Sequence, residues 1–266
     1  MKNLLLSAGI IVFFLLLLLL CGCRKDYYSV DKIDSNIRIK MWETLDSTKR
    51  TLQFYCSTEK VYGCSNYGIS TTFSKFYNNI EIDFNEVLIY DWCLTSLGPA
   101  TTIIDHGTLS NGTYNLNINV DRHKSEGRLM VKSDYYAIEL DKQKQLIIIN
   151  TTLHRIPANT IWGTVGYHRS STATLVQTFI DSLQFLGATA QTYQSGDYGY
   201  FEIDSSGQII TPQNHGYHFI RPFIFNYDSN TSSLKKIVKN YGANNGDSLI
   251  INLYTTKGEL FRSWIP

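Results

Sequence analysis

Apolar and polar residues alternate along most of the chain between residues 37 and 156. In the segment TYNLNINV, Tyr114, Leu116, Ile118 and Val120 share one face of an expected strand, and the asparagines share the other. Similar runs separated by turn residues predict seven or eight strands, at 37–45, 50–58, 68–75, 79–90, 101–106, 113–120, 128–140 and 145–154. Their number and spacing favour a β-sandwich over residues 37–156 rather than a parallel sheet.

The spacing of apolar residues changes after residue 157, from the alternation of strands to the spacing of helices. Apolar residues recur every three or four positions in the segments 171–188 and 232–242, which predicts two helices. Gly187 and Gly242 stand where these helices are expected to end, because a left-handed residue often follows a helix. Strands are predicted around the helices, at 160–168, 199–203, 217–227 and 248–255.

The order strand, helix, strand, strand, helix, strand favours an α+β domain over residues 157–266. It is the order of the split βαβ, or ferredoxin-like, arrangement, in which two helices cover one face of a four-stranded antiparallel sheet. Pro222 conflicts with this arrangement, because its strand would be central and proline cannot donate a ladder hydrogen bond. A bulge at Pro222 would remove the conflict, and so would a different α+β sheet.

The N-terminal segment has the pattern of an export signal. Lys2 is followed by an apolar run from Leu4 to Leu20 and then by small residues. About 17 apolar residues is also the lower limit for crossing a bilayer, so a simple membrane anchor is the alternative.

The segment Leu20-Cys21-Gly22-Cys23 resembles the lipobox of bacterial lipoproteins, although a cysteine at the second position is unusual for that motif. The resemblance implies that residues 1–22 are removed and that Cys23 becomes the lipidated N-terminus. Residues 23–36 are polar and predict a short tether. We therefore expect a protein anchored by lipid in the cell envelope, in particular the outer membrane.

Two further segments, STEKVYGCSNYGI and CLTSLGPATTIIDHGTLSNGTYNLNI, resemble the N-terminal domain of lipoproteins from Bacteroidota whose function is not established. This resemblance supports the sandwich and the envelope, and it implies no activity. The segment LSNGTYNLNI is also similar to the entry of a late strand in immunoglobulin-like domains. That similarity implies an immunoglobulin-like sandwich in which the Tyr114 hydroxyl pins the turn; an ordinary core tyrosine is the alternative.

Three cysteines follow Cys23. Cys56 shares a strand face with Leu52 and Phe54 and is expected in the core, whereas Cys64 and Cys93 lie beside turn residues. In an oxidising compartment we predict a Cys64–Cys93 disulfide, with three free thiols as the alternative.

Charge and motifs exclude several functions. The chain has 24 Lys and Arg against 23 Asp and Glu and no basic run, so nucleic acid is not expected as a partner. His215 and His218 are three residues apart and would face opposite ways on a strand, so no metal site is predicted there. No catalytic or phosphate-binding motif is present, and we expect no cofactor.

Aromatic residues are dense in the second domain, where they predict either core packing or ligand contact. We consider Trp162, Tyr167, Tyr198 and Tyr200 as candidate ligand-binding residues, since rings stack on sugar faces. The expected function is a non-enzymatic envelope lipoprotein: a sandwich spacer followed by a module that binds a glycan or protein ligand. The alternative is a glycan-binding protein or a glycan hydrolase that uses acids such as Glu202 and Asp204.

Overall fold

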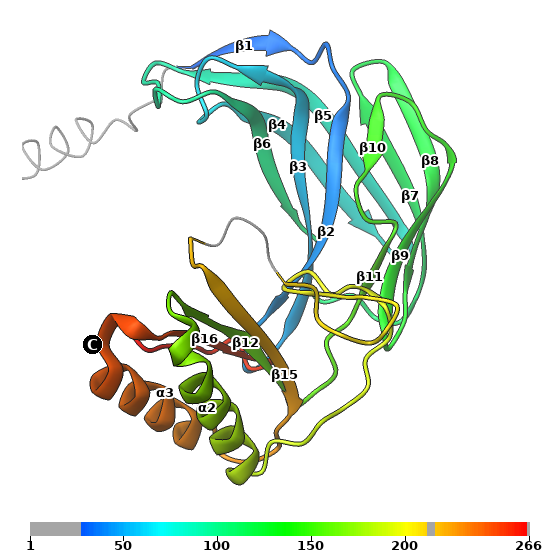
Figure 1. The fold of residues 1–266 in the computed structure, drawn as a ribbon. Helices are drawn as coiled ribbons and strands as arrows, with labels where there is room; N and C mark the ends of the chain where they lie inside the picture. Colours follow the sequence, from blue (N-terminus) through cyan, green and yellow to red (C-terminus); the bar gives the residue numbers. More distant parts are fainter. Residues whose placement is uncertain (1–27, 212–215, 265–266) are drawn as a thin grey trace, which may run out of the picture.

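The computed structural model describes residues 28–211 and 216–264, and within them the chain is mainly β. Eleven of the described strands form one large curled sheet (Figure 1). They are β1 (Tyr28–Lys32), β2 (Ile37–Leu45), β3 (Arg50–Tyr62), β4 (Gly68–Phe76), β5 (Asn79–Tyr90), β6 (Gly98–Asp105), β7 (Gly112–Val120), β8 (His123–Val131), β9 (Tyr135–Lys142), β10 (Leu146–Ile148) and β11 (Thr152–His154).

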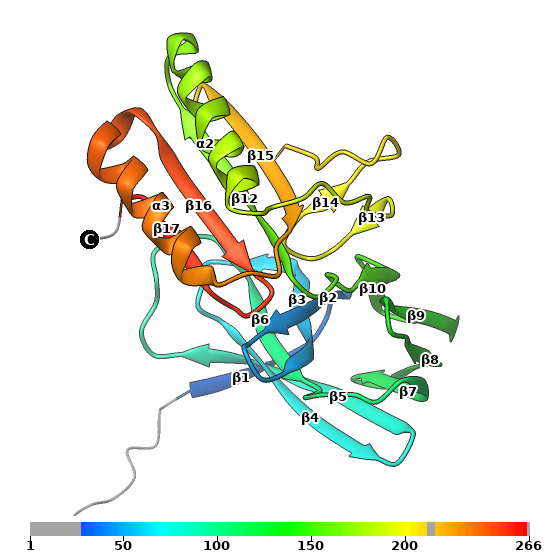
Figure 2. The ribbon, with the colours of Figure 1, turned by 90° about the horizontal axis from the view of Figure 1, so that it is seen from below.

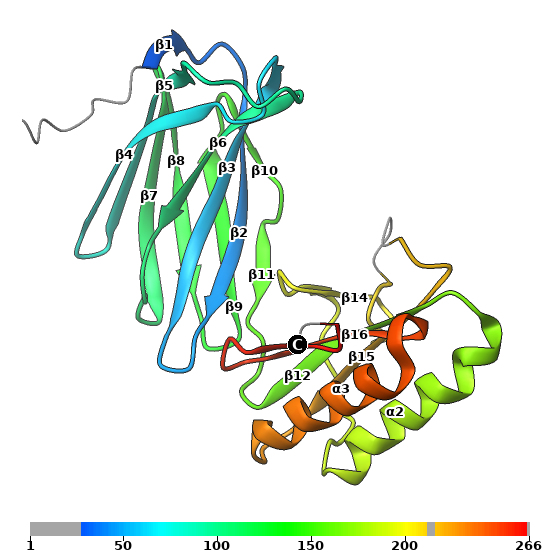
Figure 3. The same ribbon diagram turned by 90° about the vertical axis from the view of Figure 1, so that its left-hand side faces the viewer.

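The sheet has the order β10-β2-β3-β6-β4-β5-β7-β8-β9-β11, and β1 pairs with β5. Register shifts occur between β3 and β6, between β4 and β5, and between β8 and β9. Such bulges bend a strand and increase its twist. The sheet curls as a result, and β2, β3 and β6 come to face β7, β8 and β9 (Figures 1 and 3).

An immunoglobulin-like sandwich of two separate sheets is not confirmed. The hydrogen-bond ladder runs without a break from one layer to the other, because β5 pairs with β7 in parallel over six residues. One element of that resemblance is present: the Tyr114 hydroxyl donates to the Ser110 carbonyl at 2.9 Å and so pins the turn before β7.

The inward-facing residues of the curled sheet form its hydrophobic core. On β2, Ile37, Ile39 and Met41 are fully buried and alternate with outward-facing polar residues. The predicted Cys64–Cys93 disulfide is confirmed, with a Cα–Cα distance of 5.3 Å. Cys56 is a free thiol in the core, as expected, and burial raises its pKa.

The N-terminal predictions lie largely outside the described residues. The signal segment 1–22 and Cys23 are not among them. Of the predicted tether 23–36, residues 28–32 form β1, a strand of the sheet that the polar sequence did not indicate. No helix in the described part of the chain is long and apolar enough to cross a membrane.

The two ends of the curled sheet meet along β2. β10 pairs with β2 in parallel, and the chain then leaves the ladder. Beyond this point the Asn150 side chain replaces the missing strand as the hydrogen-bond partner of β2. Its Oδ1 accepts from the Met41 amide at 2.7 Å, and its Nδ2 donates to the Met41 carbonyl at 3.1 Å. A side-chain amide can in this way replace a missing strand partner.

A buried carboxylate lies two residues further along β2. Glu43 accepts a hydrogen bond from the Tyr136 hydroxyl at 2.9 Å and forms ion pairs with Arg155 at 2.9 Å and Arg50 at 3.5 Å. The Glu43 side chain is 3% exposed. Arg50 also donates to the Ile156 carbonyl at 2.6 Å, so this network joins β2, β3 and β9 to the segment that leads out of the sheet.

The remaining elements follow residue 157. A four-stranded antiparallel sheet has the order β15-β12-β16-β17. Two helices lie on the same face of it (Figures 2 and 3). The elements are β12 (Thr160–Tyr167), η1 (Ser170–Thr172), α2 (Ala173–Phe185), β13 (Gly196–Asp197), β14 (Glu202–Ile203), β15 (Phe219–Asn226), α3 (Thr231–Asn245), η2 (Gly246–Ser248), β16 (Ile250–Thr255) and β17 (Leu260–Arg262).

The predicted ferredoxin-like strand order is present for three of its four strands. The remaining predicted strand does not join the sheet. β15 and β16 flank β12 as that arrangement requires, but the segment 199–203 does not join this sheet. Its residues Glu202–Ile203 pair with β13 as a separate hairpin. β15 is therefore an edge strand, and Pro222 sits where a missing donor costs little.

The two glycines expected at the helix ends have different roles. Gly187 follows α2 with φ +101, as predicted for a left-handed residue. Gly242 lies inside α3 instead, where a side chain would collide with the backbone of Ser263 after β17. The absence of a side chain lets the helix approach the sheet closely.

His106 is a polar residue enclosed in the first core. It is 4% exposed, its ring lies 4.2 Å from that of Phe54 and 5.0 Å from that of Phe73, and both ring nitrogens lack a hydrogen-bond partner in the described residues. Burial lowers the pKa of His106 to about 4, although the charge of Asp105 acts in the opposite direction.

We predict that replacing Glu43 with Gln lowers the free energy of unfolding by about 3 kcal/mol, because two half-buried guanidinium groups lose their buried countercharge. Denaturant unfolding of the purified protein measures this change. Glu59 is the matched control: its pair with Arg38 is about half exposed, and Glu59→Gln should cost less than about 1 kcal/mol. Equal losses for the two variants would contradict the central role of Glu43.

We also predict a pH-dependent stability that His106 causes. Because its pKa is about 4 when folded and 6.5 as an ordinary value, the unfolded chain binds more protons between these pH values. The free energy of unfolding should therefore have its full value above pH 6.5. It should fall by about 3 kcal/mol as the pH is lowered to 4. His106→Leu should remove this slope, whatever its constant effect on stability. The exposed His123, changed to Gln, should leave the slope intact.

Candidate functional site

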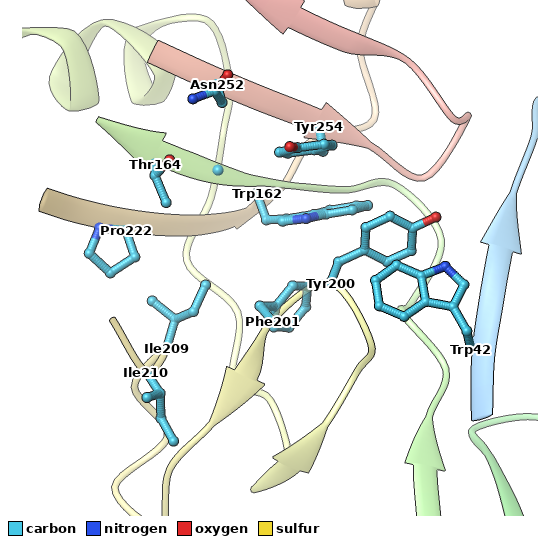
Figure 4. A pocket seen from close by; sticks show the side chains of 11 residues that line it. Trp42, Trp162, Thr164, Tyr200, Phe201, Ile209, Ile210, Pro222, Asn252 and Tyr254 are labelled. Atoms are coloured by element: carbon cyan, nitrogen blue, oxygen red, sulfur yellow. The ribbon is translucent and has the colours of Figure 1, made fainter. Parts of the chain in front are cut away.

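A cleft lies between the two sheets, on the face of the second sheet that the helices leave free. Its cavity volume is about 430 Å³. β12, β15 and β16 contribute one wall, the segment 200–210 contributes a second, and Trp42 of β2 closes one end (Figure 4). The lining side chains used below are Trp42, Trp162, Thr164, Tyr200, Asn252 and Tyr254.

Strand alternation places these side chains in the cleft. On β12, Ile161 and Val165 pack towards the helices, so Trp162 and Thr164 point the other way. On β16, Ile251 and Leu253 pack towards the helices, which directs Asn252 and Tyr254 into the cleft. The same strands thus supply both the helix-covered core and the cleft wall.

Aromatic rings form a continuous path from the first sheet to the second. The ring centroids of Trp42 and Tyr200 are 4.6 Å apart, and those of Tyr200 and Trp162 are 5.3 Å apart. Trp162 stacks nearly parallel on Tyr254 at 5.8 Å. Burial among these groups raises the pKa of the Tyr200 hydroxyl.

Hydrogen-bonding groups without protein partners lie at the other end of the cleft. Thr164 and Asn252 are directly opposite each other on β12 and β16, and both are half-buried. Their side chains form no hydrogen bond within the described residues. The Nε1 donor of Trp162 is buried and also has no acceptor in that part of the chain. The cleft therefore combines an apolar wall with a polar end.

Two of the four predicted ligand-binding residues line this cleft, namely Trp162 and Tyr200. The other two lie elsewhere. Tyr198 is buried in the β13–β14 hairpin, where it stacks on Phe201 at 5.0 Å and donates to the Gln194 carbonyl. Tyr167 stacks on Phe219 at 5.2 Å and packs against the helix-covered core.

Sequence reasoning missed Trp42, Thr164, Asn252 and Tyr254. Alternation in the segment INLYT separates Asn252 and Tyr254 from the core positions and could have identified them. Trp42 carried no such signal, because it comes from the first sheet and meets the cleft only through the packing of the two sheets.

Three acids of the β13–β14 region, including the two considered for hydrolysis, lie outside the cleft. Asp204 accepts hydrogen bonds from the Ser206 and Gln208 amides in a turn, and these bonds lower its pKa. Asp197 accepts from Asn150 and from the Gly199 amide. Glu202 is exposed. None of the three lines the cleft.

The structure does not place the two histidines of the segment 215–218 relative to each other. His215 lies outside the described residues, and the Nδ1 atom of His218 is 3.1 Å from the His168 carbonyl. Among the described residues, no cluster of three His, Cys, Asp or Glu side chains could hold a metal ion.

In comparisons with known proteins, no protein-family model, no curated protein and no solved structure matches the chain. The function must therefore be argued from the geometry of the cleft.

Proposed function

We propose that the protein is an envelope lipoprotein, anchored through Cys23, that binds a small ligand in the aromatic cleft. The lipobox-like segment before Cys23 supports the anchor. The curled sheet acts as a spacer: β1, which follows the anchor in the chain, lies at the opposite end of the molecule from the second sheet and its helices (Figure 1).

The proposal of a ligand rests on one observation. The cleft has an apolar wall and, at one end, polar side chains without hydrogen-bond partners in the described residues. The half-buried rings of Trp42, Tyr200 and Tyr254 offer apolar surface over the buried Trp162, while Thr164 and Asn252 offer hydrogen-bond donors and acceptors. A volume of about 430 Å³ is in the range of small-molecule sites. The ligand class is a molecule with a flat apolar face and a polar group at one end.

A glycan end is the second candidate for the cleft. A sugar ring has an apolar face that stacks on rings such as Trp42 and Tyr200, and its hydroxyls suit Thr164 and Asn252. The mostly apolar wall favours one terminal sugar over a long chain. A glycan array probed with the protein and with Thr164→Phe tests this candidate directly.

A glycan hydrolase has the least support. Hydrolysis of a glycosidic bond requires two carboxyl groups on either side of it. Neither Glu202 nor Asp204 lines the cleft, and Asp204 is engaged in its own turn. We therefore propose binding rather than catalysis as the role of the cleft.

We predict that the Thr164→Phe variant binds a cleft probe at least about tenfold more weakly, because a new ring fills the polar end. The probe is 1-anilinonaphthalene-8-sulfonate, which has flat apolar rings and one polar group; its fluorescence on titration with protein 24–266 gives the affinity. Thr174→Phe adds the same ring at an exposed position of α2 and should bind as the unaltered protein does. Equal affinities for the two variants would exclude the cleft as the binding site.

We predict that Cys23→Ser releases the protein from the membrane fraction, since the acyl chains that hold it are lost. Intact-mass analysis of the unaltered protein should show removal of residues 1–22 and an acylated Cys23. A full-length mass that retains Met1, or an unmodified Cys23, would contradict the proposed anchor.

A further inference from the structure

The connection between β5 and β6 exposes three large apolar side chains. Trp92 is 63% exposed, Leu94 is 50% exposed and Leu97 is 78% exposed. They lie within seven residues, 91–97, whose only charged member is Asp91. A concentrated apolar group of this kind on a surface usually marks an interaction site.

This loop is firmly held in place. The Cys64–Cys93 disulfide ties it to the turn after β3. Asn66 donates to the Trp92 carbonyl at 2.8 Å and accepts from the Leu94 amide at 3.2 Å, while the hydroxyls of Ser65 and Ser96 are 2.6 Å apart. The loop therefore presents its apolar side chains in a fixed arrangement and cannot easily fold them inward.

The loop also lies beside β1, the first strand of the described residues. Tyr28, the first residue of β1, pairs with Tyr90, the last residue of β5, and the loop begins at the next residue. Cys23 is five residues before Tyr28, a length of chain that spans at most about 17 Å when fully extended. A lipid on Cys23 would keep this end of the sheet close to the bilayer surface.

We propose that Trp92, Leu94 and Leu97 insert into the interfacial region of the phospholipid bilayer that carries the anchor. This inference rests on the proposed lipidation of Cys23. Tryptophan favours the membrane–water interface, and leucine gains from burial among acyl chains. The contact is apolar rather than electrostatic, because the loop has no basic residue to attract anionic lipids. The insertion is a second point of attachment, and it fixes the orientation of the molecule on the surface.

The experiment attaches the protein chemically at its natural anchor point. A chain that begins at Cys23 is coupled through that thiol to a maleimide lipid in phosphatidylcholine vesicles; Cys56 is buried and Cys64 and Cys93 are bridged. Brominated phosphatidylcholine then quenches tryptophans that enter the bilayer. We expect strong quenching that the Trp92→Phe variant loses, and a decrease of at least about half in the Leu94→Ser, Leu97→Ser double variant.

Phe76 provides the matched control. It is 70% exposed at the turn between β4 and β5, at the other end of β5 from Tyr90, roughly 36 Å away along a strand of twelve residues. Phe76→Ser should leave the quenching unchanged. Unquenched Trp92 would overturn the inference and leave a protein contact as the use of the loop. Quenching that requires anionic lipid would also overturn it.

The outcome is independent of whether the cell lipidates Cys23, because the coupling supplies the attachment. The mass of the native protein decides the anchor, and the quenching decides the loop. If the native protein is lipidated but Trp92 is not quenched, the anchor stands and the insertion of the loop fails. If Trp92 is quenched but the native protein is not lipidated, the loop inserts and the proposed anchor fails.

Discussion

The buried carboxylate of Glu43 constrains how the strands of the curled sheet come together. A carboxylate without countercharges in a protein interior costs several kcal/mol. Glu43 avoids this cost only when Arg50 of β3, Tyr136 of β9 and Arg155 after β11 all reach β2. These groups come from distant parts of the chain, so satisfying one charge requires the sheet to close in a single register. Arg50 and Arg155 also fix the path by which the chain enters β12.

The same strand connects this network to the cleft. Trp42 precedes Glu43 and points to the opposite face of β2, where it meets Tyr200. Because side chains alternate along a strand, a slip of one residue would place the indole in the core and the carboxylate in the cleft. The geometry of the cleft wall therefore depends on an ion-pair network that lies outside the cleft. The Asn150 side chain adds to this coupling, since it binds both Met41 of β2 and Asp197 of the hairpin beside the cleft.

Period and turn chemistry predicted the individual elements well and their assembly poorly. β2 and β5 have the predicted bounds, and the facing of Cys56 led correctly to the Cys64–Cys93 bridge. Alternation identifies a buried face but does not say which strand lies beside it. β5 pairs with β7 in parallel and so joins the two expected layers into one sheet. No local sequence pattern indicates this pairing. β1 was missed because its polar residues form an edge strand, which needs only backbone partners.

The candidate site shows the same limit. Trp162 and Tyr200 were accessible to sequence reasoning because aromatic residues are dense in their segments, but density alone also selected Tyr198 and Tyr167, which pack elsewhere. Trp42 belongs to the site through long-range packing. Asp204 is held outside the cleft by local turn bonds, and Glu202 is exposed outside it.

The burial of Cys56 has a consequence for redox chemistry. Three cysteines in an oxidising compartment allow three different pairings, and only the thiolate form of the unpaired cysteine attacks an existing bridge. Burial raises the pKa of the Cys56 thiol and encloses it between β2 and β6, so the folded protein holds no competent nucleophile at that position. The core thus prevents disulfide exchange, and the odd cysteine is tolerated as long as β3 packs before it can be oxidised.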